Sequence, residues 1–230
     1  MEAQIQAVIF DMYETLVTQF SGPLYYGTQI AQDLGLAPEA FLPGWRATEQ
    51  DRATGKQTFE DTIEMLMKAH GIWSAEKHRQ VVQKRIAIQA DCFHHLHPEI
   101  LPMLSALKAK DIKIGLITNC FSEEAQLIRE SELFPFFDAP CLSYELGVRK
   151  PDPAIYHACL EKLGIPAANA LYAGDGGGQE LETAGALGMW AVQATWYRQE
   201  SFKKYHAALR PEFLQISEPM RLPELCAHGY

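Results

Sequence analysis

Short apolar runs alternate with helix-like segments from Pro98 to the C-terminus, and this alternation constrains the fold more than any other feature of the sequence. The apolar runs predict strands at 112–118, near 137–143, at 170–174 and at 189–195. Apolar residues at helical spacing predict helices at 98–111, 122–131, 152–164 and 178–188. Such alternation is typical of βαβ units, in which helices cover both faces of a mainly parallel sheet. A last run at 212–217 is a candidate edge strand.

The N-terminal part of the chain has a different pattern. Residues 6–11 are typical of a short buried strand, but no second strand is indicated before about residue 98. Instead, about four helices are predicted, at 23–35, 38–55, 58–71 and 74–90. We therefore predict an α/β fold with a doubly wound, mainly parallel sheet formed by residues 1–16 and 98–230. A helical subdomain at 17–97 is inserted after the first strand.

Charge and cysteine content limit the classes of partner. The 20 Lys and Arg residues against 29 Asp and Glu residues give a net charge of −9, which argues against nucleic acid or an anionic membrane as a partner. The five cysteines form no C-x-x-C pair, as expected for reduced thiols. Neither a signal peptide nor an apolar stretch of about 20 residues is recognisable. We expect a soluble cytoplasmic protein, monomeric or homodimeric, that binds a small anionic metabolite.

Polar side chains follow several of the predicted strands at the point where each strand ends. In a doubly wound sheet, the ligand site lies beyond the carboxyl ends of the strands, near the point where the strand order reverses. A purely structural sheet has no need of a polar residue at each strand end. The residues at these ends are Asp11 after the first strand, Thr118 and Asn119 at the second, Lys150 in the segment after the third, and Asp175 after the fourth.

These strand ends carry four motifs in order, namely FDMYET at 10–15, Thr118, RKPDP around Lys150, and AGDGGGQE at 173–180. Together they resemble the motifs of the haloacid dehalogenase (HAD) superfamily of hydrolases. The resemblance covers nearly the whole chain, and the helical insert is similar to the four-helix cap of one branch of that superfamily. It implies a Rossmann-like core with a cap that supplies substrate specificity.

The resemblance also implies roles for individual residues. Asp11 would be the nucleophile that forms a covalent aspartyl intermediate, while Thr118 and Lys150 would hold the group being transferred. Mg²⁺ is the implied cofactor, because two facing carboxylates repel each other without a cation. Its expected ligands are the carboxylates of Asp11, Asp175 and Glu180 and the backbone carbonyl of Tyr13.

Tyr13 departs from the pattern of the phosphatases in this superfamily, which usually carry a second Asp there as a general acid and base. Tyrosine has an ordinary pKa of about 10, so it can donate a proton but is a poor base near neutral pH. The dehalogenase branch carries tyrosine here, since a halide leaves without a proton. That branch needs no metal and lacks the acids of GDGGGQE, so the first and fourth motifs favour different reactions. Glu14 is a further option, as a displaced acid.

Contacts with the substrate are expected from the cap and from Asn119. The cap candidates are Tyr25, Tyr26, Trp45, Arg46 and Arg52, of which we select Tyr25 and Arg46. Arg46 is similar to an arginine that binds the substrate carboxylate in dehalogenases. Arg52 has Glu49 three residues before it, which favours an ion pair on the helix surface.

Three functions are consistent with the sequence. We favour Mg²⁺-dependent hydrolysis of a small phosphate monoester through Asp11. The first alternative is dehalogenation of a small 2-haloacid, which Tyr13 would suit. The second is a catalytically weak module that binds Mg²⁺ and an anion.

Overall fold

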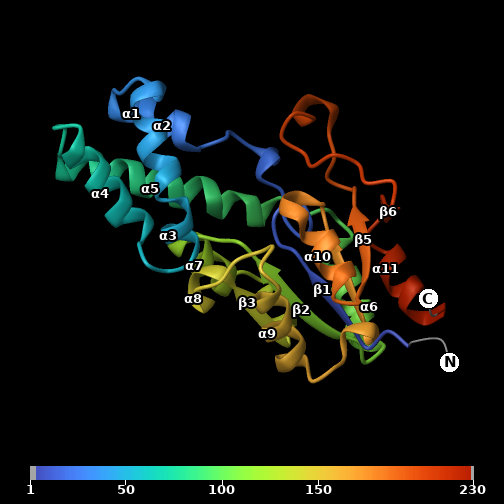
Figure 1. The fold of residues 1–230 in the computed structure, drawn as a ribbon. Coiled ribbons are helices and arrows are strands. Elements are labelled where there is room, and N and C mark those ends of the chain that lie inside the picture. The colour runs from blue at the N-terminus through green and yellow to red at the C-terminus, as the bar shows by residue number, and fades with distance from the viewer. Residues whose placement is uncertain (1–3, 229–230) are drawn as a thin grey trace.

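The structure is a computed structural model that describes residues 4–228. Within these residues, six parallel strands form one sheet with the order β3-β2-β1-β4-β5-β6 (Figure 1). Every predicted strand is confirmed, and so is the candidate edge strand. The strands are β1 (Ala7–Phe10), β2 (Lys113–Thr118), β3 (Ala139–Leu142), β4 (Ala170–Gly174), β5 (Trp190–Ala194) and β6 (Leu214–Ile216).

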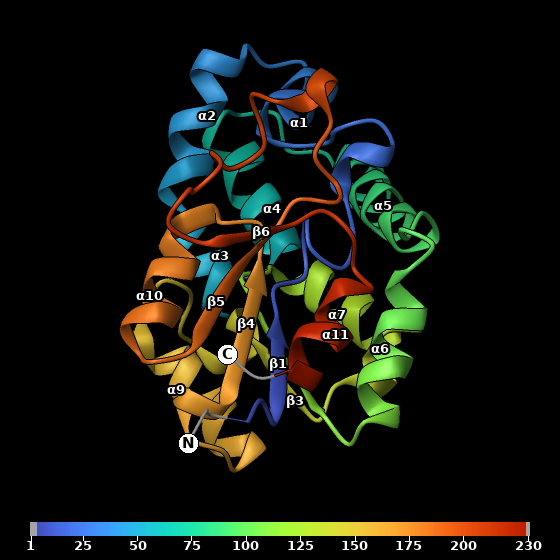
Figure 2. The same ribbon diagram turned by 90° about the vertical axis from the view of Figure 1, so that its right-hand side faces the viewer.

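Helices cover both faces of this sheet, as the alternating pattern predicts. Val8 and Phe10 of β1 point into an apolar cluster with α6 and α11, whereas Ala7 and Ile9 point into a second cluster with α9 and α10. Figure 2 shows these two pairs of helices on opposite sides of the strands. The helices of the core are α6 (Ile100–Ala109), α7 (Ser122–Glu130), α8 (Ser143–Leu146), α9 (Pro153–Leu163), α10 (Glu180–Ala186) and α11 (Arg221–His228).

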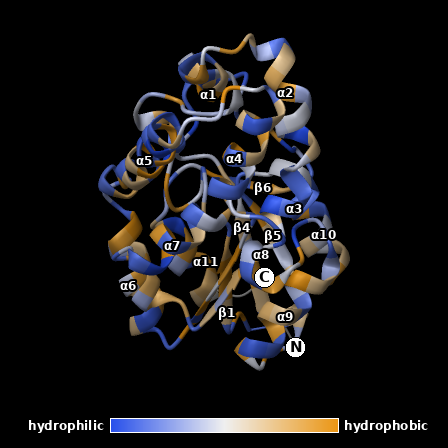
Figure 3. Ribbon diagram, turned by 90° about the vertical axis from the view of Figure 1, so that its left-hand side faces the viewer, coloured by the Kyte–Doolittle hydropathy of each residue, from blue (hydrophilic) through white to orange (hydrophobic). Residues whose placement is uncertain are grey.

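Helices α1 to α5 form a separate group beyond the sheet, with an apolar cluster of their own that includes Tyr25, Phe41 and Phe59 (Figure 1). Figure 3 shows hydrophilic and hydrophobic residues alternating along these helices, as expected where each helix buries one face. We keep the proposed boundaries 17–97 for this part and call it the cap. Its helices are α1 (Gly27–Leu34), α2 (Pro38–Ala47), α3 (Glu49–Ala53), α4 (Phe59–Ala69) and α5 (Ala75–Asp91).

The single helix predicted at 38–55 is wrong, because the chain forms two helices there. Thr48 lies between α2 and α3 with a φ of −92° and a ψ of −1°, and its hydroxyl donates to the carbonyl of Trp45 at 2.9 Å. A threonine side chain that bonds the backbone in this way competes with the helix for its hydrogen bonds. The break turns α3 toward the core, where it lies beside α8 (Figure 1). None of the helices in residues 4–228 is long and apolar enough to cross a membrane.

Candidate active site

The register of the parallel strands brings the acids of the first and fourth motifs together. Phe10 is level with Ala173 of β4, so Asp11 and Asp175 follow neighbouring strands at the same edge of the sheet. Glu180 begins α10 directly after the glycine-rich turn. One carboxylate oxygen from each of these three acids lies within 4.8 Å of the others. The structure thus assembles three of the residues that the sequence assigns to a metal site.

Lys150 is the cation at the centre of this acid cluster. Its Nζ lies 2.5 Å from Asp11 Oδ1 and 2.5 Å from Glu180 Oε2, and the side chain is buried. Asn119 fixes the backbone of Lys150 from both sides, since its Oδ1 accepts from the Lys150 N–H at 2.8 Å and its Nδ2 donates to the Lys150 carbonyl at 3.1 Å. The amide of Asn119, which the sequence assigns to the substrate, is therefore engaged in holding Lys150.

Glu180 is held by three other groups besides Lys150. Tyr172 donates its hydroxyl to Glu180 Oε2 at 2.8 Å, and the N–H of Gly176 donates to Oε1 at 3.0 Å. A Cβ at Gly174 would lie 2.2 Å from Glu180 Oε1, so this position needs glycine. The hydroxyl of Tyr156 donates to the Glu180 carbonyl at 3.2 Å.

The sequence motifs did not identify Tyr172 as a site residue, although the sequence does indicate a polar role for it. It is a phenol within the apolar strand β4, and a buried tyrosine hydroxyl usually finds a polar partner. Its hydroxyl lies 3.2 Å from Lys150 Nζ as well as near Glu180. Tyr172 therefore links the lysine to the acid of the fourth motif.

The cluster carries an excess of negative charge. Burial raises the pKa of Asp11 to about 7, with Lys150 acting against this shift and Glu180 and Asp175 adding to it. Burial, and then Glu180, raise the pKa of Asp175 to about 7. Burial lowers the pKa of Lys150, but attraction to Asp11 and Glu180 outweighs it, so the net shift is upward and the amine is charged. One ammonium facing three carboxylates leaves a net negative charge, which a divalent cation would offset.

The donor atoms of the cluster fit Mg²⁺. Asp11 Oδ1 is paired with Lys150, and Asp175 Oδ1 accepts from the N–H of Gly177 at 2.9 Å. The second carboxylate oxygen of each accepts no hydrogen bond from residues 4–228, so both stay open to a ligand. Hard oxygen donors of this kind, completed by water, are the usual ligands of Mg²⁺ in proteins.

Thr118 lies fully buried at the end of β2, and its hydroxyl makes only a long 3.4 Å contact with the Asn119 carbonyl. Two of the backbone N–H groups that follow, those of Cys120 and Phe121, have partners within the protein. Cys120 N–H donates to Ser143 Oγ at 3.0 Å, and Phe121 N–H donates to Glu124 Oε2 at 2.9 Å. The hydroxyl of Thr118 and the backbone N–H of Asn119, which has no hydrogen-bond partner among residues 4–228, are thus donors that this loop can offer to a ligand.

Tyr13 has a buried hydroxyl with no hydrogen-bond partner among the described residues. Burial, and then the nearby Glu124, raise the pKa of Tyr13 well above its ordinary value, while Arg85 acts in the opposite direction. The phenol therefore stays protonated near neutral pH and faces the boundary with the cap, where Arg85 lies. It can donate a hydrogen bond there but cannot act as a base.

The contacts of the Glu14 carboxylate argue against the hypothesis that Glu14 is a displaced acid. Its carboxylate accepts from the Thr18 hydroxyl at 2.8 Å and from the Gln19 N–H at 2.8 Å. His206 Nδ1 lies a further 4.0 Å from Glu14 Oε2. These contacts tie the carboxylate to the start of the connection into the cap.

The two cap residues selected from the sequence are not placed at the acid cluster. Tyr25 is buried in the cap core, where its hydroxyl donates to Asp33 Oδ2 at 2.8 Å, and Arg46 is exposed on α2. Arg52 is buried instead, with its guanidinium over the ring of Phe121 in the core. The predicted pair of Arg52 with Glu49 is wrong, because Glu49 pairs with Arg149 at 3.1 Å.

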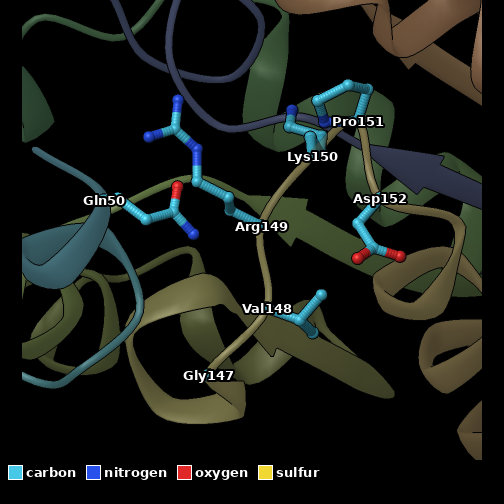
Figure 4. A pocket seen from close by; sticks show the side chains of 7 residues that line it. All are labelled: Gln50, Gly147, Val148, Arg149, Lys150, Pro151 and Asp152. Atoms are coloured by element: carbon cyan, nitrogen blue, oxygen red, sulfur yellow. The ribbon is translucent and has the colours of Figure 1, made fainter.

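A cavity of about 470 Å³ opens beside Lys150, between the cap and the core. Gln50 of α3 lies on one side of it, and the segment that joins α8 to α9 lies on the other (Figure 4). The residues of that segment are Gly147, Val148, Arg149, Lys150, Pro151 and Asp152. The cavity thus adjoins the segment that carries Lys150.

Sequence comparison relates this chain to hydrolases. The profile of the haloacid dehalogenase-like hydrolases matches residues 5–188. A phosphoglycolate phosphatase from Yersinia pseudotuberculosis is 26% identical over 228 residues, covering 96% of this chain and 95% of the relative. A glyceraldehyde 3-phosphate phosphatase from Methanopyrus kandleri is 27% identical over 55% of this chain and 54% of its own length. This chain spans about half the length of the glyceraldehyde 3-phosphate phosphatases that it matches.

Solved structures share the fold. A 2-haloacid dehalogenase from Pseudomonas syringae pv. Tomato DC3000 has a TM-score of 0.67 at 21% identity, with 97% of this chain and 99% of that chain covered. A HAD family enzyme from Bacteroides thetaiotaomicron, solved as a magnesium complex, has a TM-score of 0.66 at 16% identity, with 86% and 97% covered. Both similarities confirm the Rossmann-like α/β architecture.

Proposed function

The chain belongs to the haloacid dehalogenase-like hydrolase family, and on this premise we propose that it hydrolyses small phosphate monoesters, with Mg²⁺ and a covalent aspartyl intermediate at Asp11. The observation that carries the proposal is the buried cluster of Asp11, Asp175 and Glu180 around Lys150. The curated relatives named above are phosphatases, which supports the same reaction class.

The metal would be held by the open carboxylate oxygens of Asp11 and Asp175 and by the backbone carbonyl of Tyr13. Glu180 stands behind them, since both of its carboxylate oxygens are already hydrogen-bonded to the protein. When bound, Mg²⁺ supplies positive charge that offsets the negative charge of the phosphoryl oxygens and of the nucleophile.

Four residues of this chain have separate roles in the proposed reaction. Asp11 attacks phosphorus, so that a bond forms between its carboxylate oxygen and phosphorus while the bond from phosphorus to the ester oxygen breaks. Lys150 and the Thr118 hydroxyl hold the phosphoryl oxygens as negative charge shifts. Tyr13 hydrogen-bonds the departing oxygen. Water then attacks the phosphorus of the aspartyl phosphate, and the bond from phosphorus to the Asp11 oxygen breaks, which restores Asp11. The protons of this water end on the released phosphate and on the departed alkoxide oxygen.

The identity of Tyr13 limits which esters react well. A phenol with a raised pKa is a weak acid, so it assists a poor leaving group less than a carboxylic acid does. The proposed reaction is therefore fastest with esters whose leaving group needs little protonation.

Dehalogenation of a 2-haloacid is the second candidate, and Tyr13 is the observation that favours it. In that reaction Asp11 displaces a halide from carbon, and no proton is needed by the leaving group. The buried acids weigh against it, because a metal-free reaction gains nothing from Asp175 beside Asp11.

An assay of two substrate panels separates the candidates. The purified protein is given phosphate monoesters or 2-haloacids, each with Mg²⁺ or with EDTA, beside Asp11→Asn as the control. Phosphate release that needs both Mg²⁺ and Asp11 supports the proposal. Halide release that EDTA leaves unchanged supports the dehalogenase. Inactivity on both panels, with Mg²⁺ still raising thermal stability, indicates a weak binding module.

A further inference from the structure

Two arginines of the cap are buried where the cap meets the core, and they differ in how their charges are satisfied. Arg85 of α5 donates from Nε to Glu123 Oε1 at 3.0 Å, from Nη2 to Glu124 Oε1 at 2.6 Å, and from Nη1 to the Tyr25 carbonyl at 2.9 Å. Each nitrogen of its guanidinium thus has an acceptor. Arg85 therefore links the cap to the core with every nitrogen of its guanidinium paired.

Arg52 of α3 is 1% exposed, but not every nitrogen of its guanidinium has an acceptor. Within residues 4–228 its guanidinium makes hydrogen bonds only through Nη1, to the Trp45 carbonyl at 2.9 Å and to the Thr48 hydroxyl. Nε is buried without a partner. Nη2, on the same edge of the guanidinium as Nε, likewise donates to no described residue.

The acids nearest to Arg52 are bound elsewhere. Glu123 is held by Arg85 and by the hydroxyl of Ser122, and Glu49 is paired with Arg149. A buried guanidinium N–H with no acceptor, such as that of Nε, is costly because it has lost water and gained nothing. Native proteins rarely leave such a donor unmatched, so Nε, with Nη2 beside it, is suited to an acceptor from outside the chain, either a water or a ligand.

The position of Arg52 relates this edge to the active site. Its Cζ lies 3.5 Å from the ring centre of Trp45 and 4.8 Å from that of Phe121. Phe121 follows Thr118 in the loop that ends β2, so the guanidinium stands above the loop that would hold the phosphoryl group. The unpartnered hydroxyl of Tyr13 lies at the same boundary between cap and core.

We propose that Arg52 binds a carboxylate on the leaving group of the substrate, which makes the substrate class phosphate monoesters of short hydroxy acids. This inference rests on the proposed phosphatase function and deepens it. The two donors along one edge of a guanidinium match the two oxygens of a carboxylate. The rings of Trp45 and Phe121 fix the plane of the guanidinium before the ligand arrives.

The test compares two esters in four proteins. One ester is the phosphate of a short hydroxy acid, and the other is the phosphate of the matching alcohol without the carboxylate. The proteins are the wild type, Arg52→Gln, Arg52→Lys and, as a matched control, Arg46→Gln, which changes an exposed arginine of the same part of the cap. We expect Arg52→Gln to lower kcat/KM for the hydroxy acid ester about 10- to 100-fold, mainly through KM, with less than about threefold change for the alcohol ester. Arg52→Lys should restore part of the loss, and Arg46→Gln should match the wild type.

A binding measurement separates failure of this inference from failure of the phosphatase function. The free hydroxy acid and the free alcohol are titrated by calorimetry into the same proteins. Binding of the hydroxy acid alone, lost in Arg52→Gln and kept in Arg46→Gln, supports the carboxylate site even if neither ester is hydrolysed. Equal losses on both esters in Arg52→Gln, or equal use of both esters by the wild type, would overturn it and leave the phosphatase function standing.

Discussion

At the scale of single residues, Tyr13 would decide in the proposed reaction how well this site can protonate a leaving group. Its hydroxyl is buried without a partner, and its pKa is raised above the ordinary value for tyrosine. It therefore keeps its proton at neutral pH and is a weak acid. A carboxylic acid in the same place would donate a proton more readily and could then activate water as a base.

Tyr13→Asp should raise kcat for esters with poor leaving groups at least about tenfold, since a general acid contributes about 10²- to 10⁴-fold. The gain should be small for esters with good leaving groups, which depart without a proton. Tyr13→Phe is the matched control, because it keeps the ring and removes only the hydroxyl. Steady-state rates on one ester of each kind check this prediction. An equal gain on both esters would show that proton donation is not what Tyr13 limits.

At the scale of elements, α5 of the cap and α7 of the core are joined by a buried charge cluster. Arg85 lies between Glu123 and Glu124, and Glu124 also accepts from the N–H of Phe121 at the start of α7. Removal of one member of a buried ion pair costs about 3–5 kcal/mol, since the partner stays buried and charged. The same contact therefore orders the loop after β2 and holds the cap near it.

Arg85→Met should lower the free energy of unfolding by about 3–5 kcal/mol and make stability more sensitive to pH. Burial raises the pKa of Glu124 to about 7, with Arg85 acting against this shift. The folded protein then binds this proton more tightly than the unfolded chain, so stability falls as pH rises from about 4.5 to 7. Without Arg85 the pKa of Glu124 rises further, so the fall should continue to higher pH, and in Glu124→Gln it should be weaker. Urea titrations between pH 5 and 8 measure both slopes, and parallel slopes in all three proteins would contradict this account of α5 and α7.

At the scale of the whole molecule, the proposed metal site would make stability depend on Mg²⁺. The pKa values of Asp11 and Asp175 are both raised to about 7, so protons compete with the cation below that pH. Without metal, ionising these acids destabilises the fold as pH rises from about 4 to 7. Bound Mg²⁺ offsets this repulsion. Its stabilising effect should therefore be greater above pH 7 than at pH 5.

Thermal denaturation with Mg²⁺ or with EDTA measures this effect. We expect a larger rise in Tm with Mg²⁺ at pH 8 than at pH 5, and the loss of most of that rise in Asp175→Asn. Asp61→Asn is a control, because Asp61 is exposed on α4 of the cap and outside the acid cluster. An Mg²⁺ effect that is the same at both pH values, or that Asp175→Asn keeps, would speak against a metal site at these carboxylates.

The sequence was sufficient for those features that repeat along the chain. Strands and helices alternate with clear periods, and the residues at the strand ends, Asp11, Lys150 and Asp175, converge because the strands are parallel. Contacts between distant segments could not be predicted in this way. The break at Thr48 turns a short helix toward the core, and only that turn places Arg52, rather than Arg46, against Phe121.

The covalent intermediate is the most direct test of the central claim. Wild-type protein is mixed with a phosphate monoester and Mg²⁺, quenched within one turnover, and examined by mass spectrometry for a phosphoryl group on Asp11. The account predicts this adduct in the wild type, its loss in EDTA, and its absence in Asp11→Asn. Phosphate release without an adduct on Asp11, or halide release that EDTA leaves unchanged in place of phosphate release, would contradict the account.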